Sequence, residues 1–252
     1  MKRPLFPLPL AAFLLMALLL TAACTSKSPK AASGTLTYSE EPNQPGDTTF
    51  YGLACEGCTD SIIVILPFSG GDPDTIDILN ARVNRRVFGR PKIGDQLAVI
   101  FDTVGTRIAS MVVNIDELQG QWCYQVQPRL RRRYGDTASV QQLPTNLPDS
   151  LRRRWLQPRE YGFDLRRDHA ALPIGAVRRT EAEQGPVEYP PLKRYREWRL
   201  FNGRLLLCDT RRDTTDRQHI VDIDTADFVL LRRDSLVLRF ADHEQGYYRK
   251  QE

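Results

Sequence analysis

The sequence predicts an all-β protein in which an antiparallel up-and-down barrel (residues 116–252) follows a small N-terminal β domain (residues 34–115). Three observations support this prediction. Short runs of β-branched and apolar residues recur along the chain, separated by clusters of glycine, proline and aspartate. Several runs alternate apolar and polar residues, which is typical of strands with one buried face. Asn202-Gly203 between two such runs predicts a tight hairpin, because a type I′ turn needs positive φ at both central residues.

The first 23 residues are typical of a secretory signal peptide. Lys2 and Arg3 provide a positive start, and an apolar run at 8–20, broken only by Pro9, leads through small residues to Cys24. The arrangement resembles a bacterial lipoprotein signal. That resemblance implies that Cys24 becomes the first residue of the mature chain and carries acyl chains such as palmitate. An ordinary signal peptide followed by a chance cysteine is the alternative.

Residues 24–33 are small and polar, and we expect a flexible tether there. Several acyl chains on Cys24 would hold the chain to a membrane, so the sequence predicts a protein of the bacterial cell envelope. The outer membrane is favoured, with the folded part outside the cytoplasm. The 35 basic and 31 acidic residues are too evenly balanced for a dedicated nucleic-acid binder, so no nucleic-acid partner is expected. We expect a monomer.

The N-terminal β domain contains four predicted strands between turn signals, and a small barrel is one way in which they could close. They are Ser61–Leu66, Thr75–Leu79, Gln96–Phe101 and Arg107–Val113.

The barrel region opens with the clearest alternation in the chain, at residues 118–127, and a second alternating run surrounds Phe163. A two-residue turn at Asn202-Gly203 would pair Leu200 with Leu205 and Trp198 with Leu207 on one face. Arg196 would then face Asp209 on that face, while Arg199–Leu206 and Glu197–Cys208 would pair on the other.

A second hairpin is predicted around Asp234-Ser235, with further strands near Ile220–Ile223 and Gly246–Lys250. It would place on one side Val229, Leu231, Leu236, Leu238 and Phe240. About eight short antiparallel strands with one apolar face favour a closed barrel or a strongly curled sheet, since closure removes exposed edges.

Gly120-Gln121-Trp122, at the start of this meander, is similar to the GxW signature of lipocalins. The later phrases YGFDLRRD, YREWRLFNGRLLLCD and DFVLLRRDSLVLRFADHEQGYYRK resemble the lipocalin-like domain of lipoproteins from the Bacteroides group. The resemblance covers residues 116–252. It implies that a late arginine packs across Trp122 and closes one end of the barrel, with Arg249 as the best match and Arg239 as a competitor.

The segment at 128–159 is long for a loop inside a compact domain. Asp149-Ser150 could cap a short helix that runs through Arg154 or Trp155. The lipocalin resemblance implies a lid in which Trp155 and Leu156 pack on the barrel mouth. The alternative is a mobile, basic surface loop. Two runs, LRRRY (130–134) and LRRRW (151–155), place arginines beside aromatic residues, which suits a solvated face or, less simply, anionic lipid headgroups.

Four cysteines remain after Cys24. Cys55-Glu56-Gly57-Cys58 is a CxxC, and we expect a local disulfide because the location is oxidising. A thioredoxin-like redox pair would need a helix after the motif, and a zinc site would need two further ligands. The motif also resembles the start of copper-resistance lipoproteins of the NlpE type, which keeps a thiol-metal or envelope-stress sensor as an alternative. The pairing of Cys123 and Cys208, both on predicted outward faces, stays open.

No enzyme is expected, because no reactive constellation is present. Asp222 and Asp224 form a possible carboxylate pair that we interpret as a solvated strand face, and the three histidines are expected at the surface. No metal or cofactor is expected. The predicted function is binding of a small apolar or amphipathic ligand inside the barrel, and a filled-core structural or interaction module is the alternative. The candidate lining residues are Trp198, Leu200, Leu205, Leu207, Leu231 and Leu238.

Overall fold

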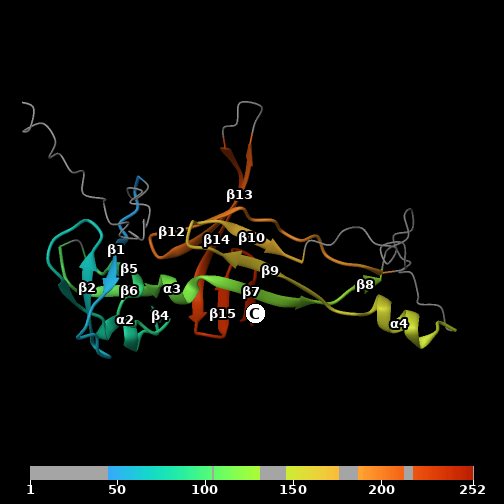
Figure 1. Ribbon diagram of the computed structural model, residues 1–252, viewed down its shortest axis with the longest axis horizontal. Helices are drawn as coiled ribbons and strands as arrows, with labels where there is room; N and C mark the ends of the chain where they lie inside the picture. Colours follow the sequence, from blue (N-terminus) through green and yellow to red (C-terminus); the bar gives the residue numbers. More distant parts are fainter. Residues whose placement is uncertain (1–44, 104, 131–145, 176–186, 213–217, 252) are drawn as a thin grey trace, which may run out of the picture. The chain divides into compact units, whose positions relative to one another are not determined.

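The computed structural model describes residues 45–103, 105–130, 146–175, 187–212 and 218–251, in which β-strands predominate (Figure 1). The predicted signal peptide, Cys24 and the tether lie outside these ranges. Within them, no helix has the length and apolar character needed to cross a bilayer.

The first sheet contains six strands in the order β3-β2-β1-β5-β6-β4, antiparallel except for the pairing of β4 with β6. A parallel bridge between Asp77 and Ile108 joins β3 to the start of β6, and the Asp77 amide donates to the Arg107 carbonyl at 2.8 Å. The result is a partly open Greek-key barrel of the OB type, formed by all the strands of this sheet except β4. The strands are β1 (Phe50–Ala54), β2 (Ile62–Pro67), β3 (Asp74–Asp77), β4 (Val87–Phe88), β5 (Gln96–Phe101) and β6 (Ala109–Asn114).

Three of the four predicted N-terminal strands agree closely with β2, β5 and β6. The predicted strand Thr75–Leu79 is too long, because helix α2 (Leu79–Val83) begins where the Asp77 carboxylate accepts the Leu79 amide at 2.8 Å. Strand β1 was missed, since Gly52 interrupts its apolar pattern. Close approach of β2 requires that glycine, because a Cβ at position 52 would lie 2.4 Å from the Leu66 carbonyl oxygen.

The second sheet contains eight antiparallel strands in the order β10-β9-β7-β16-β15-β14-β13-β12. Its two edges meet where the Ala171 amide donates to the Arg196 carbonyl at 2.9 Å and the Trp198 amide donates to the His169 carbonyl at 2.8 Å. The predicted up-and-down barrel is therefore confirmed and nearly closed. The strands are β7 (Gly120–Val126), β9 (Arg159–Leu165), β10 (Ala171–Ile174), β12 (Glu197–Phe201), β13 (Arg204–Arg212), β14 (Gln218–Leu231), β15 (Ser235–Arg239) and β16 (Glu244–Arg249).

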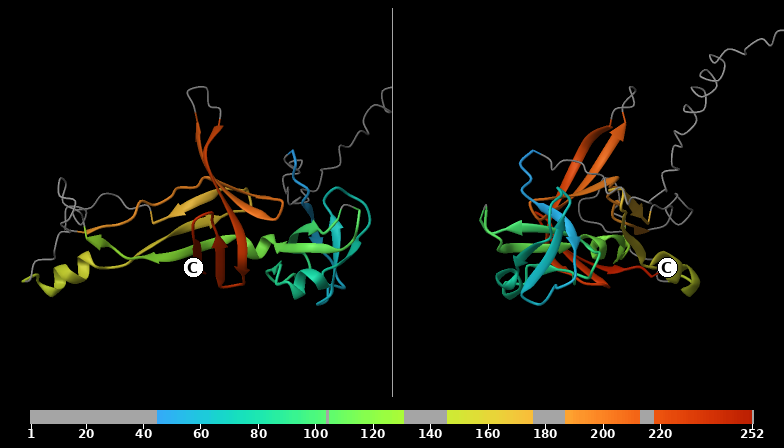
Figure 2. Two further views of the ribbon diagram at one scale, coloured as in Figure 1. Left: turned by 180° about the vertical axis from the view of Figure 1, so that it is seen from behind. Right: turned by 60° about the vertical axis from the view of Figure 1, so that its left-hand side comes forward.

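Smaller elements complete the described chain. Helix α3 (Ile115–Leu118) leads into β7, and the long connection after β7 contains helix α4 (Asp149–Trp155). Strands β8 (Arg129–Leu130) and β11 (Val187–Glu188) pair with each other. Figure 2 shows the hairpin of β13 and β14 continuing beyond β12, whose pairing with β13 stops at Cys208.

The Asn202-Gly203 hairpin has the predicted register, with Leu200 opposite Leu205 and Trp198 opposite Leu207. The second hairpin differs from the prediction at one position. An irregularity between Phe228 and Leu230 shifts the strand register, so Phe228 faces Leu238 and is buried, whereas Val229 is not. A β-bulge of this kind changes which side chains face inward, and alternation alone does not reveal it.

Arg249 and Trp122 close one end of the barrel. The Arg249 guanidinium lies 4.2 Å from the centroid of the Trp122 ring, which is fully buried. The same guanidinium donates to the carbonyls of Gln119 at 2.6 Å, Glu117 and Arg233. Arg239 instead pairs with Glu244.

The two sheets share one buried hydrophobic cluster, in which Phe88 and Val113 pack with residues of the eight-stranded barrel. The Asn202-Gly203 turn is also held from the N-terminal side, since the Asn202 side chain accepts from the Thr48 amide and the Asp47 carboxylate accepts from the Asn202 amide. A domain boundary at residues 115/116 stays a prediction.

We expect Gly120→Ala to lower the free energy of unfolding by about 1–3 kcal/mol. Gly120 has φ +123°, and a Cβ there would lie 2.3 Å from Arg249 Nη1, which is held by its carbonyl partners. Urea denaturation measures the loss. Gly246→Ala is the matched control, because a Cβ on this glycine of β16 meets nothing within 4 Å. Equal stabilities of the two variants would contradict the prediction.

Candidate functional site

A group of aromatic side chains occupies the barrel interior beyond Trp122, and we call it the tyrosine cluster. Its rings meet mostly edge to face or tilted, at centroid distances from 5.0 Å (Phe163–Tyr247) to 6.3 Å (Tyr124–Tyr161). Tyr124 and Tyr195 are its partly exposed members, so this part of the interior reaches solvent. The cluster contains Tyr124, Tyr161, Phe163, Tyr195 and Tyr247.

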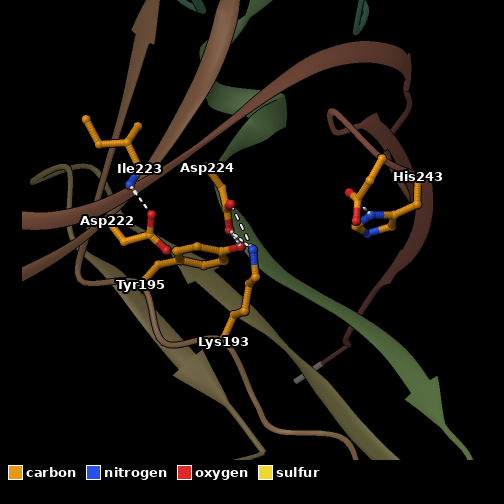
Figure 3. Close-up of polar contacts among 7 residues, drawn as sticks. Lys193, Tyr195, Asp222, Ile223, Asp224 and His243 are labelled. Atoms are coloured by element: carbon orange, nitrogen blue, oxygen red, sulfur yellow. Dashed lines mark hydrogen bonds and ion pairs between the residues drawn. The ribbon is translucent and has the colours of Figure 1, made fainter.

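A carboxylate, Asp224, lies beside the tyrosine cluster on the inner face of β14. Its strand position is opposite Leu207, and its side chain is only 19% exposed. Lys193 Nζ contacts both carboxylate oxygens, at 2.8 and 2.6 Å, and the Tyr195 hydroxyl donates to Oδ2 at 2.6 Å (Figure 3). A charge this far from water requires such partners.

The hydroxyl groups of Tyr195 and Tyr247 are held in their protonated form. Burial, followed by the hydrogen bond to Asp224, raises the pKa of Tyr195 well above its usual value. Burial also raises the pKa of Tyr247, with smaller contributions from Tyr124 and Asp224. The site therefore combines phenol donors, one carboxylate, one ammonium group and aromatic ring surface.

The predicted lining residues are more buried than Tyr124, Tyr195 and Asp224. They face inward as expected, and each is at most 8% exposed and belongs to the shared core cluster, as Phe163 and Tyr247 of the tyrosine cluster also do. The six are Trp198, Leu200, Leu205, Leu207, Leu231 and Leu238. Tyr124, Tyr195 and Asp224 are partly exposed residues of the inner face.

The sequence did not indicate Lys193 or Tyr195 as site residues. Counting back from Trp198 by twos assigns Arg196 to the inner face, and Arg196 does approach Asp209 at 3.9 Å. Tyr195 is out of phase with this alternation, so a strand pattern points it outward. It turns inward because it lies before β12, where the chain is not yet in strand conformation.

Asp222 and Asp224 differ in environment, although they lie two residues apart. Asp222 is exposed and accepts only its neighbour's amide, from Ile223 at 3.0 Å, among its described contacts. Figure 3 shows no shared partner of the two carboxylates among the residues drawn. The interpretation of both as a solvated strand face is therefore wrong for Asp224.

The side chains of two histidines are described, and neither belongs to a group of residues that could bind a metal. His243 is half exposed and pairs with Asp242 at 2.6 Å, while the His169 ring packs on Trp198 at 5.3 Å. The side chain of His219 lies outside the described residues. No group of three or more histidine, cysteine or acidic side chains in the described part of the chain is arranged to hold a metal.

Cys55, Cys58, Cys123 and Cys208 are all free thiols in the structure, so the expected disulfide of the CxxC is not shown. The motif forms the turn between β1 and β2, where the Cys58 thiol donates to the Cys55 carbonyl at 3.3 Å. Cys123 and Cys208 lie on β7 and β13, which are not neighbours in the sheet. Burial raises the pKa of both these thiols.

Helix α4 confirms the predicted short helix that ends at Trp155, but Pro148 rather than Asp149 or Ser150 occupies the N-cap position. No residue of the helix is buried, and Leu156 just after it is 37% exposed. Trp155 is partly exposed, and its packing on the barrel mouth stays a prediction. The side chain that reaches Asp224 beside the tyrosine cluster is Lys193.

No family model matches the chain, and no curated protein matches it. Among solved structures, the chain is similar to the crystal structure of a lipocalin-like protein from Bacteroides thetaiotaomicron, at 15% identity, with a TM-score of 0.27. The match covers 52% of this chain and 95% of that chain. So low a score carries no argument, and the barrel assignment rests on strand order and register. The NlpE-like resemblance finds no support.

We expect the Tyr195→Phe variant to lose less folding stability at high pH than the wild-type protein does. Because the pKa of Tyr195 is raised in the folded chain, the unfolded chain loses this proton first, and native stability falls above about pH 10. Urea midpoints at about pH 8 and about pH 11 should therefore differ less in the variant than in the wild type. An equal difference in both proteins would show that Tyr195 does not contribute.

Alkylation should divide the four cysteines into two pairs. After reduction, iodoacetamide should modify the half-buried Cys55 and Cys58 in the folded chain and leave Cys123 and Cys208 unmodified until urea is added. Burial excludes the reagent from the second pair, and their raised pKa lowers the thiolate fraction. Mass spectrometry of the peptides gives the rates, and labelling of Cys123 as fast as Cys58 would contradict the buried placement.

Proposed function

We propose that this chain is a membrane-anchored lipoprotein of the bacterial cell envelope whose barrel binds a small amphipathic molecule at the tyrosine cluster. The observation that carries the proposal is Asp224, an acidic side chain on the inner face of the barrel, beside aromatic rings and in contact with Lys193 and Tyr195. Ligand sites typically combine apolar walls with a few fixed polar groups. No chemical step is proposed.

The binding mechanism follows from the two kinds of surface. The apolar part of the ligand would pack on the exposed ring surface of Tyr124 and Tyr195, with a gain of roughly 25 cal/mol per Å² of apolar area buried. Its polar group would reach Lys193 and Asp224. Since Lys193 is 62% exposed, its ammonium group can also reach an acceptor on the ligand, while the Tyr195 hydroxyl keeps its hydrogen bond to Asp224.

The membrane anchor is part of the proposal and is supported by the sequence at Cys24 and by the small polar residues that follow it. Native mass spectrometry of the protein purified from its own membrane tests anchor and ligand together. The expected result is an acylated Cys24 and one retained small molecule. An unmodified cysteine would refute the anchor, independently of the outcome for the ligand.

The filled-core module is the second candidate, because the predicted lining residues are buried against one another. In that case the barrel would serve as a scaffold, and neither a retained molecule nor saturable binding of a probe would be found.

Titration with the fluorescent apolar probe N-phenyl-1-naphthylamine separates these candidates. We expect saturable binding of one probe per chain, and about threefold to tenfold weaker binding to Tyr124→Ala, because the probe loses an aromatic partner. Tyr189→Ala is the control, since Tyr189 lies outside the barrel and contacts the residues after α4. Equal affinities of the two variants would exclude the tyrosine cluster as the site, and absence of saturable binding would favour the filled core.

A further inference from the structure

Helix α4 presents an apolar face framed by arginines to solvent. Leu151 and Trp155 lie four residues apart and therefore share a face, and Arg152 and Arg154 flank it on either side. Leu151 is 37% exposed, and Leu156 just after the helix is equally exposed. No residue of α4 is buried, and Trp155 is partly exposed.

The helix is fixed in place by its end rather than by its side chains. The Tyr189 hydroxyl donates to the Gln157 carbonyl at 2.6 Å and lies 3.4 Å from the Trp155 carbonyl, and the Arg159 guanidinium covers the Tyr189 ring at 3.8 Å. A seven-residue helix is not stable alone in water, because helices shorter than about 12–15 residues are marginal. The contacts at Tyr189 therefore hold the end of a helix in which Leu151 is exposed and Trp155 is partly exposed.

Helix α4 carries a net positive charge. It contains three arginines and one acidic residue, Asp149. Within the described ranges, none of the three arginines (Arg152, Arg153 and Arg154) forms an ion pair. Guanidinium groups bind phosphate in a bidentate manner, and tryptophan favours the boundary between lipid headgroups and acyl chains. An exposed basic helix with an aromatic and aliphatic face suits the surface of an anionic bilayer.

We propose that α4 docks on the anionic lipid surface of the membrane to which the chain is anchored, with Leu151 and Trp155 at the headgroup boundary and Arg152 and Arg154 on lipid phosphates. The proposal rests on the anchor of the proposed function. It adds a second, charge-dependent attachment that is separate from the tyrosine cluster.

The tryptophans make the docking directly measurable. The chain has three, and Trp122 and Trp198 are 0% and 1% exposed, so Trp155 alone is positioned to meet lipid. The acylated full chain is reconstituted into phosphatidylcholine vesicles with brominated acyl chains, with or without phosphatidylglycerol. We expect tryptophan quenching only with phosphatidylglycerol, and its loss in Trp155→Phe. Quenching should also fall as salt rises from about 0.1 M to about 1 M, where the Debye length shrinks from about 10 Å to about 3 Å.

A matched pair of variants separates docking from general attraction. Arg152→Gln with Arg154→Gln should reduce quenching to the level seen without phosphatidylglycerol. Arg232→Gln with Arg233→Gln removes the same charge from an exposed turn and should leave quenching unchanged. Equal quenching in both lipids, no quenching in either, or an equal loss in both variants would overturn the proposal. Mass measurement of Cys24 in the same sample tests the anchor separately. If Cys24 is not acylated, the anchor fails, and co-sedimentation of added protein with each vesicle type still tests α4.

Discussion

The cation over the indole at Trp122 is the constraint on which the barrel depends. Arg249 belongs to the last strand, and its guanidinium donates to carbonyls just before β7, in the first part of the barrel, and to Arg233 in the turn before β15. One side chain therefore joins the beginning and the end of the meander where its first and last strands pair. Gly120 leaves the space that the guanidinium occupies. Because Arg249 and Trp122 fill this end of the barrel, the part of the interior that faces solvent lies at the tyrosine cluster.

Alternation in the sequence was sufficient to predict most of the barrel. Leu200, Leu205 and Leu207 are paired and buried as the Asn-Gly turn requires, because a side-chain period of two leaves no other register that keeps them inside. The prediction was wrong at Val229, where a bulge changes the register by one residue. A bulge depends on how two strands twist against each other, and that information is not local to either strand.

The candidate site was harder to predict, for a physical reason. Asp224 lies on the inner face, which the alternation allows, but a carboxylate there is stable only with partners. Those partners, Lys193 and Tyr195, come from a segment without regular structure, where no periodic rule fixes the direction of a side chain. Sequence patterns identify strands and the faces of strands. They do not identify a side chain that enters a barrel from outside its strands.

The predicted lining residues stay a prediction, but their burial shows why an inward direction does not by itself make a side chain accessible to a ligand. Trp198 and Leu207 are directly opposite each other and shield each other from water, so an inward direction makes them core. Contact with a small molecule requires ring surface that the fold has not already covered, as at Tyr124, and a polar group whose partner can be exchanged, as at Asp224 with the exposed Lys193. The neighbours that cover an inward side chain, more than its hydrophobicity, therefore decide whether it belongs to the core or remains available for binding.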